Sequence, residues 1–307
     1  MAFDCCRNES ASAEIPVPGA DGAGHERDSS TAVLLGYREA KSSLRMTKMP
    51  LTFYKKPGLV VYVTCGDPDL ATTRDVVLAA IEAGADVIEL GVPFSDPVAD
   101  GPVIQRASER ALKNGTCLAQ VLTLAAGVRQ KAQSTGLVVF SYLNPILRMG
   151  MGKFCRIARH AGVDGVLLTD LPVEEADEYL RAMRANDLAP IFLVAPTSTD
   201  ERLKRIAEAS RGFVYAVSRT GVTGARKKLA SDAQKLVRRL RRVTKLPVAV
   251  GFGISNAEQF VEVGKFADAA VVGSAIVGTI ERNRGREAEA VGEFVRDLTA
   301  AGSRVTA

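Results

Sequence analysis

The chain contains little histidine and little cysteine. Of its two histidines in 307 residues, His25 lies in a polar stretch and His160 in a helical pattern. Imidazole catalysis and histidine-rich metal sites are therefore not expected. The cysteines are odd in number and irregularly spaced, which favours reduced thiols over a disulfide framework or a zinc site. They are Cys5, Cys6, Cys65, Cys117 and Cys155.

Long apolar runs are also absent. No run approaches the roughly 20 residues needed to cross a bilayer. The first ten residues lack the apolar core of a signal peptide, and Asp4 and Glu9 argue against a transit peptide. Hydrophobic residues make up 47% of the chain and charged residues 24%, which is the balance of a globular protein. We therefore expect a cytoplasmic protein without a membrane segment.

The net charge of +5 raises the question of a nucleic-acid partner. The densest basic run, residues 237–242, falls in an amphipathic helical pattern whose apolar positions face inward. No pattern of stacking aromatic residues accompanies it. We interpret the run as a solvated helix face and expect no nucleic-acid binding.

Residues 1–50 differ in composition from the rest of the chain. They are rich in Ala, Gly, Ser and charged residues and show no sustained periodicity, which predicts a disordered N-terminal extension. Residues 51–307 are the predicted catalytic domain. Met46 and Met49 stand just before this domain, so either is an alternative translation start that the intact mass of the native protein would reveal.

From residue 58 onward, short β-branched runs alternate with longer helical segments. The runs are nearly continuous in apolar residues, as in parallel strands that are buried on both faces. Eight strands, each followed by a helix, predict a (β/α)8 TIM barrel, whereas an open doubly wound sheet has about five or six strands. Capping patterns at Thr72-x-x-Asp75 and Ser255-x-x-Glu258 mark two helix starts. The predicted strands are residues 59–64, 87–90, 137–142, 165–169, 190–194, 213–217, 248–250 and 269–272.

Two carboxylates stand out at the end of the second predicted strand, where a parallel barrel carries its active site. Glu89 interrupts a buried run, and burial would raise its pKa, which suits a group that gives and takes protons. Asp100 follows in a loop rich in proline and glycine. Two structural alternatives remain open: Glu89 as a partner in a buried ion pair, and Asp100 as the N-cap of a helix that begins near Pro102.

Glycine-rich loops follow the last three predicted strands. Residues 251–255 and 273–275 stand after strands seven and eight, the usual phosphate site of a barrel, where glycine lets the backbone approach an anion closely. Residues 218–224, after strand six, combine two glycines with small polar residues, as in a lid that closes on a substrate. Ordinary tight turns and an ordinary exposed loop are the alternatives.

What the strand ends lack narrows the chemistry further. No lysine stands at any of the eight predicted C-terminal strand ends, so a Schiff-base aldolase would have no nucleophile. No cluster of metal ligands is present for a metal-dependent aldolase. The remaining hypothesis is a carbon–carbon lyase in which paired carboxylates act on a phosphate-bearing substrate.

Several segments resemble one known family, the tryptophan synthase alpha chains. The similarity spans about residues 50 to 285 in order, and the run Glu-Leu-Gly-Val-Pro-Phe-Ser-Asp-Pro at 89–97 is its most specific part. The resemblance implies cleavage of indole-3-glycerol phosphate into indole and glyceraldehyde 3-phosphate, as a step of L-tryptophan biosynthesis. The segments are residues 62–68, 89–102, 218–224, 251–254 and 273–277.

The resemblance also implies individual roles. Glu89 would handle the protons at indole carbon 3 and at the side-chain hydroxyl, while Asp100 would hydrogen-bond the indole N–H. Tyr215 matches a tyrosine near the glyceryl portion, and Thr223 a lid threonine that engages the loop aspartate. The positions that match phosphate-binding residues are Gly224, Gly253, Gly273 and Ser274. Two departures concern the pocket lining: Tyr62 stands where the family usually has phenylalanine, and Cys65 where a plain apolar residue is common.

By the same resemblance, the partner is a tryptophan synthase beta chain in an α2β2 heterotetramer, with Pro93 and Asp96 facing it. No cofactor is expected on this chain, because no lysine is placed for pyridoxal phosphate. Three rival hypotheses remain: a phosphoribosylanthranilate-isomerase-like barrel with Cys65 as general base, a non-catalytic partner of a beta chain, and a stand-alone lyase that releases free indole.

Overall fold

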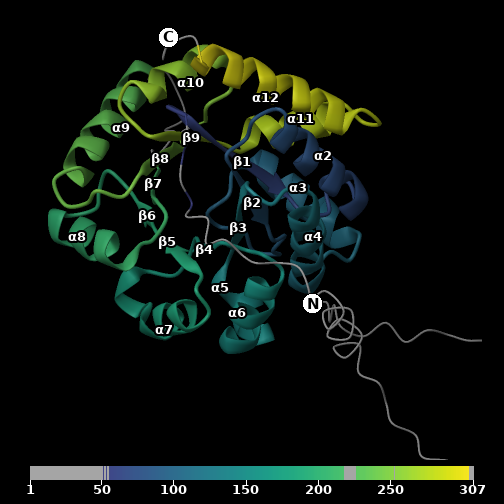
Figure 1. Ribbon diagram of the computed structural model, residues 1–307, viewed down its shortest axis with the longest axis horizontal. Helices are drawn as coiled ribbons and strands as arrows, with labels where there is room; N and C mark the ends of the chain where they lie inside the picture. The colour runs from purple at the N-terminus through teal and green to yellow at the C-terminus, as the bar shows by residue number, and fades with distance from the viewer. Residues whose placement is uncertain (1–50, 52, 54, 218–225, 252, 304–307) are drawn as a thin grey trace, which may run out of the picture. The chain divides into compact units, whose positions relative to one another are not determined.

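The computed structural model describes residues 51, 53, 55–217, 226–251 and 253–303. The predicted extension, residues 1–50, and the predicted lid, residues 218–224, lie outside these ranges. The strands of the described residues run parallel inside a ring of helices (Figure 1). They are β1 Gly58–Thr64, β2 Val87–Gly91, β3 Gly136–Ser141, β4 Gly165–Leu168, β5 Ala189–Ile191, β6 Leu193–Val194, β7 Val214–Val217, β8 Val248–Gly251 and β9 Ala269–Val272.

The helices cover the outside of the sheet, and each predicted strand is followed by at least one of them. Among the described residues no helix combines the length and the apolar character that a bilayer crossing requires. They are α2 Leu70–Glu82, α3 Pro102–Lys113, α4 Leu118–Lys131, α5 Leu143–Met149, α6 Met151–His160, the 3-10 turn η2 Val173–Glu175, α7 Asp177–Ala185, α8 Asp200–Ala209, α9 Arg226–Leu240, α10 Ala257–Gly264, α11 Ser274–Arg282 and α12 Glu287–Ser303.

The sheet closes into the predicted TIM barrel through a divided fifth strand. The sequence predicts one strand over 190–194, but the structure breaks it at Phe192 into β5, which pairs with β4, and β6, which pairs with β7. The carbonyl of Phe192 accepts a hydrogen bond from the Tyr215 N–H at 3.1 Å. The two strands at the ends of the sheet order are thus halves of one barrel strand.

Two predicted helix caps are wrong by a few residues. The N-cap of α2 is Asp69, whose carboxylate accepts from the Thr72 N–H, and not Thr72 itself. The N-cap of α10 is Asn256, whose side chain accepts from the Gln259 N–H. Asp69 is a stronger capping residue than Thr72, whereas Asn256 and Ser255 are about equal in capping preference, so that the pattern alone does not choose between them.

Three aspartates hold neighbouring strands in register at the N-terminal end of the barrel. Each stands just before a strand, and its carboxylate accepts from the backbone N–H of the neighbouring strand at 2.8 Å. Such a hydrogen bond opposes a shift of one parallel strand along its neighbour. The pairs are Asp86 with Leu59, Asp164 with Leu137, and Asp268 with Val248.

The interior of the barrel is a packed core that begins with Leu51. This side chain is 3% exposed. A Cβ atom added at Gly136, Gly165 or Gly212 would approach it to 2.7, 2.9 and 2.8 Å. The glycines therefore leave the space that Leu51 fills at the N-terminal end of the barrel. Above it lie inward-facing side chains of successive strands: Val60, Val87, Val138, Leu167, Ile191, Phe213, Ala249 and Ala269.

Candidate active site

Glu89 is the central residue of β2, in register with Tyr62 of β1 and Val138 of β3. Alternation along the strand puts it on the inward face with Val87, while Ile88 and Leu90 pack outward against the helices. Its carboxyl group is completely buried, and neither oxygen has a hydrogen-bond partner among the described residues. The part of the chain that the structure describes therefore offers no ion-pair partner for this residue.

Burial without a partner changes the protonation of Glu89. Loss of water disfavours the charged form, which raises its pKa to about 8. A buried polar group without partners also costs folding free energy. A strongly shifted carboxyl group on the inward face of a barrel strand is a candidate for proton transfer in a reaction.

Asp100 is held by a tyrosine from a distant strand end. The Tyr142 hydroxyl donates to Asp100 Oδ2 at 3.1 Å and accepts from the Ala99 N–H at 2.9 Å. Burial raises the Asp100 pKa to about 6, against the hydrogen bond from Tyr142, which lowers it. The N-cap of α3 is Gly101, so the alternative of Asp100 as that N-cap is wrong.

Tyr62 and Tyr215 lie near the two carboxyl groups. The pKa of the Tyr215 hydroxyl is raised well above its usual value, first by burial and then by the charges of Glu89, Tyr62 and Asp100. Burial and the charge of Asp100, followed by smaller contributions that include Glu89, act on Tyr62 in the same direction. The carboxyl groups thus lie close enough to act on the same hydroxyls.

Two glycines make room for these tyrosine rings. A Cβ atom at Gly251 would stand 2.6 Å from the Tyr215 hydroxyl oxygen, and one at Gly91 would collide with the Tyr62 hydroxyl. Tyr62 also packs edge-on against Phe140, with ring centroids 5.1 Å apart. Small residues on β2 and β8 therefore leave the space that the two tyrosine rings fill near Glu89.

The predicted phosphate positions lie on loops after β8 and β9. Gly253 is exposed and has a φ of +74°, a conformation that favours glycine. Gly273 precedes α11, and Ser274 is its exposed first residue. The N–H groups of a first helical turn have no partner within the helix. Thr223 and Gly224 lie outside the described residues.

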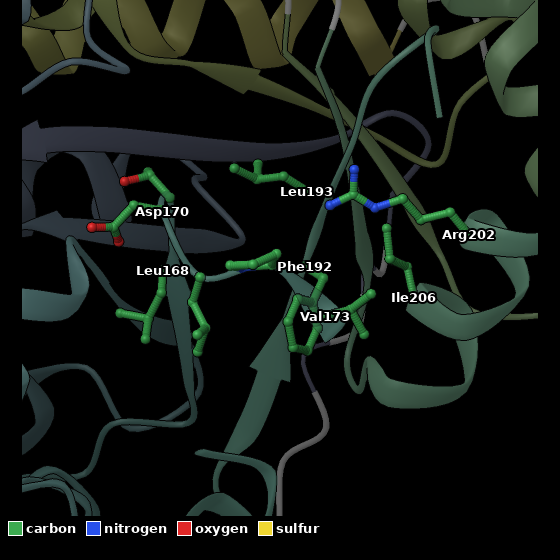
Figure 2. Close-up of a pocket in the computed structure, with 10 residues that line it drawn as sticks. Leu168, Asp170, Val173, Phe192, Leu193, Arg202 and Ile206 are labelled. Carbon is green, nitrogen blue, oxygen red and sulfur yellow. The ribbon is translucent and has the colours of Figure 1, made fainter. Parts of the chain in front are cut away.

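A separate cavity opens over the ends of β4 and β6 (Figure 2). Leu168, Phe192 and Ile206 form much of its apolar wall, and Arg202 lies across it from Asp170. Arg202 is paired with Glu174 at 3.3 Å, and the Asp170 carboxylate accepts from the Leu143 N–H at 2.8 Å. Neither Glu89 nor Asp100 lines this cavity, so it is separate from the site of the two carboxyl groups.

Comparison with known proteins identifies the family. The sequence model of one protein family, the tryptophan synthase alpha chains, matches residues 51–302. The tryptophan synthase alpha chain of Neisseria meningitidis serogroup B is 49% identical over 241 residues, which cover 78% of this chain and 92% of that protein. That of Methylococcus capsulatus is 46% identical over 259 residues, covering 84% and 97%. The chain belongs to the tryptophan synthase alpha chain family.

Solved structures agree with this assignment. The tryptophan synthase subunit alpha of Legionella pneumophila is 35% identical, with a TM-score of 0.75 over 81% of this chain and 93% of that one. A chain of the tryptophan synthase complex of Pyrococcus furiosus is 39% identical, with a TM-score of 0.74 over 81% and 100%. The protein is a carbon–carbon lyase of tryptophan biosynthesis, and the known reaction of its family is the cleavage of indole-3-glycerol phosphate.

Cys65 does not fit the rival role of a general base. Its side chain packs in the outer core, between the sheet and the helices, and is fully buried. Burial raises the pKa of its thiol, so the thiolate that a base requires is disfavoured. The structure contradicts the isomerase-like hypothesis on this residue.

Tyr142 is the member of the site that sequence reasoning missed. It stands 42 positions after Asp100 in the chain. At the end of an apolar strand it has the appearance of an ordinary core aromatic, and it is 3% exposed. The available signal is that a buried tyrosine hydroxyl needs a partner.

Proposed function

We propose that Glu89 and Asp100 are the acid/base pair with which this lyase cleaves indole-3-glycerol phosphate. The observation that carries the proposal is the carboxyl group of Glu89, which is buried without a partner and whose pKa is raised to about 8. Such a group is protonated at neutral pH and can donate a proton. After donation its anion is a strong base, because burial disfavours the charge.

The proton inventory of the reaction is balanced by one carboxyl group. Protonated Glu89 donates to indole carbon 3, and the ring nitrogen gains positive charge that ionised Asp100 stabilises through the indole N–H. The Glu89 carboxylate then removes the proton of the adjacent side-chain hydroxyl. The electron pair of that O–H bond forms the carbonyl of glyceraldehyde 3-phosphate. The carbon–carbon bond breaks, and its electron pair returns to the ring and neutralises the ring nitrogen, which leaves indole. Glu89 ends the cycle protonated, as it began.

The rest of the site binds the other end of the substrate. Backbone N–H groups at Gly224, Gly253, Gly273 and Ser274 hold the phosphate, for which the N-terminus of α11 is favourable. Tyr215 contacts the glyceryl portion. Thr223 engages Asp100 when the lid over residues 218–224 closes.

We further propose that the chain works in the cytoplasm with a beta chain, as an α2β2 heterotetramer. One of the similar solved structures is a chain of a tryptophan synthase complex, that of Pyrococcus furiosus. Among the described residues, Val98 and Leu147 are the exposed large apolar side chains, at 85% and 53%. Leu147 lies on α5, whose N-cap is Tyr142. Val98 precedes Ala99, whose N–H donates to the Tyr142 hydroxyl. A partner that covers these two side chains would also reach the Asp100 loop. Asp96 is exposed, whereas Pro93 is buried and reaches a partner only if the loop moves.

The same proposal assigns residues 51–307 to the catalytic domain and residues 1–50 to an extension outside it. The family match to residues 51–302 supports the first boundary. The packing of Leu51 in the barrel interior supports it independently.

The decisive experiment is an indole-release assay with indole-3-glycerol phosphate, with and without added beta chain. Glu89→Gln and Asp100→Asn should each lower turnover by on the order of 10²-fold or more, with substrate binding largely kept. Glu82→Gln, an exposed carboxyl at the end of α2, is the matched control and should leave turnover unchanged. Near-normal turnover of either variant would refute its role. A parent chain that only activates the beta chain would support the non-catalytic alternative.

A further inference from the structure

A chain of alternating charges links the turn after β1 to α3 and α11. Asp67 lies in that turn, and its side chain is 1% exposed. Arg110 of α3 donates from Nε and from Nη2 to the two Asp67 oxygens, each at 2.8 Å. Arg284, just beyond α11, adds a contact at 3.5 Å. The buried carboxylate is therefore fully paired, as a buried charge must be.

The chain of charges continues from α3 to α11. The Nη1 of Arg110 donates to Glu281 Oε1 at 2.9 Å. Arg106, one helical turn earlier, donates to both Glu281 oxygens at 3.1 and 2.9 Å. These hydrogen bonds, those of Arg106 first, hold the pKa of Glu281 at about 2. Glu281 therefore stays ionised over the pH range in which the enzyme works.

The two helices joined in this way carry opposite ends of the proposed site. Asp100 stands two residues before the start of α3, and Ser274 is the first residue of α11. Between the helices lies an apolar contact of Tyr62, Ala107 and Val277. Packing thus holds α3 and α11 against β1, and the charged network joins them beyond that contact.

We infer that Asp67, Arg106, Arg110 and Glu281 form a positioning network that sets the spacing between the Asp100 carboxyl group and the phosphate position at Gly273 and Ser274. The inference rests on the proposed function. A substrate that reaches from one group to the other depends on their spacing, because a small misplacement of a reacting group slows the reaction strongly. A ligand that occupies only one end does not.

The test uses Glu281→Gln and Arg106→Gln in the full chain. Their side chains are 28% and 50% exposed, so these variants avoid leaving the buried Asp67 unpaired. We expect kcat/KM for indole-3-glycerol phosphate to fall roughly 5- to 10-fold in each variant. The affinities for indole alone and for glycerol 3-phosphate alone should change by less than about twofold, since each ligand uses one end. The double variant should lose little more than either single variant.

Glu289→Gln is the matched control. It breaks the exposed pair of Glu289 with Arg286 at 2.8 Å and should leave kcat/KM unchanged. A folded Glu281→Gln protein with normal kcat/KM, or with a lower Tm alone, would overturn the network's role. So would an equal loss of affinity for both single-ended ligands and the substrate. If the parent chain itself failed to cleave indole-3-glycerol phosphate, the proposed function would fall and this inference with it.

Discussion

Glu89 should give the protein an unusual dependence of stability on pH. Burial raises its pKa from 4.5 to about 8. Between these values the unfolded chain releases the proton while the folded chain keeps it, so the contribution of Glu89 to the free energy of unfolding falls as pH rises. The contribution is constant below the lower value and constant again above the upper one.

The corresponding prediction compares Glu89→Gln with the parent chain. The variant cannot ionise, so its stability relative to the parent should increase from about pH 5 to about pH 8. Urea unfolding at both pH values measures this change. A stability difference that is the same at both would show that Glu89 titrates normally in the folded protein.

The two carboxyl groups together predict a bell-shaped pH profile. The reaction needs Asp100 ionised, with a pKa raised to about 6, and Glu89 protonated, with a pKa of about 8. The value of kcat/KM should therefore rise up to about pH 6 and fall above about pH 8. Steady-state kinetics across this range measure both limbs, and a profile without an alkaline limb would contradict the assignment of Glu89.

The variant Tyr142→Phe should affect only one limb of this pH profile. The Tyr142 hydrogen bond lowers the Asp100 pKa, so its loss should move the acid limb to higher pH and leave the alkaline limb in place. Tyr179→Phe is the control, because the Tyr179 hydroxyl donates to the Val166 carbonyl at 2.8 Å, in another part of the core. It should shift neither limb.

At the scale of the helices and strands, Arg129 and Asp164 join α4 to the segments that lead into β3 and β4. Arg129, on α4, donates to the carbonyls of Gly162, Ala132, Gln133 and Thr135 and to Asp164 Oδ2. The Asp164 carboxylate also accepts from the backbone N–H of Leu137 in strand β3. Arg129 is 7% exposed, so its charge depends on Asp164 for compensation.

Asp164→Ala should lower the free energy of unfolding by about 3 to 5 kcal/mol, because it leaves a buried guanidinium without its counter-charge. Asp75→Ala removes the partner of Arg74 in an exposed pair and should cost less than about 1 kcal/mol. Urea denaturation of both variants checks the contrast. Equal losses would mean that burial of Arg129 does not determine the effect.

The sequence predicts the elements better than their exact limits. Buried apolar runs fix the strands, and a carboxylate inside such a run made Glu89 recognisable. The break at Phe192 was not predictable, because an apolar residue continues the run and the break arises from closing a ring of strands. The contact of Tyr142 with Asp100 joins segments far apart in the chain, which a local pattern does not encode.

For the whole molecule, Leu147 offers a test of the docking side. Leu147→Asp places a charge on an apolar position of α5 that is 53% exposed. We expect at least about tenfold weaker binding of the beta chain, measured by titration, and unchanged indole release by the isolated chain. Ser231→Asp introduces the same charge at an exposed position of α9 and should leave binding intact. Normal binding of the Leu147 variant would place the partner elsewhere.

The side chain of Leu51 has a practical consequence for shortened versions of the protein. It fills a space bounded by Gly136, Gly165 and Gly212, yet it precedes the first strand. A recombinant protein trimmed to begin at residue 52 would keep every described strand but lose this buried side chain. It should unfold at a lower temperature than one that begins at residue 49.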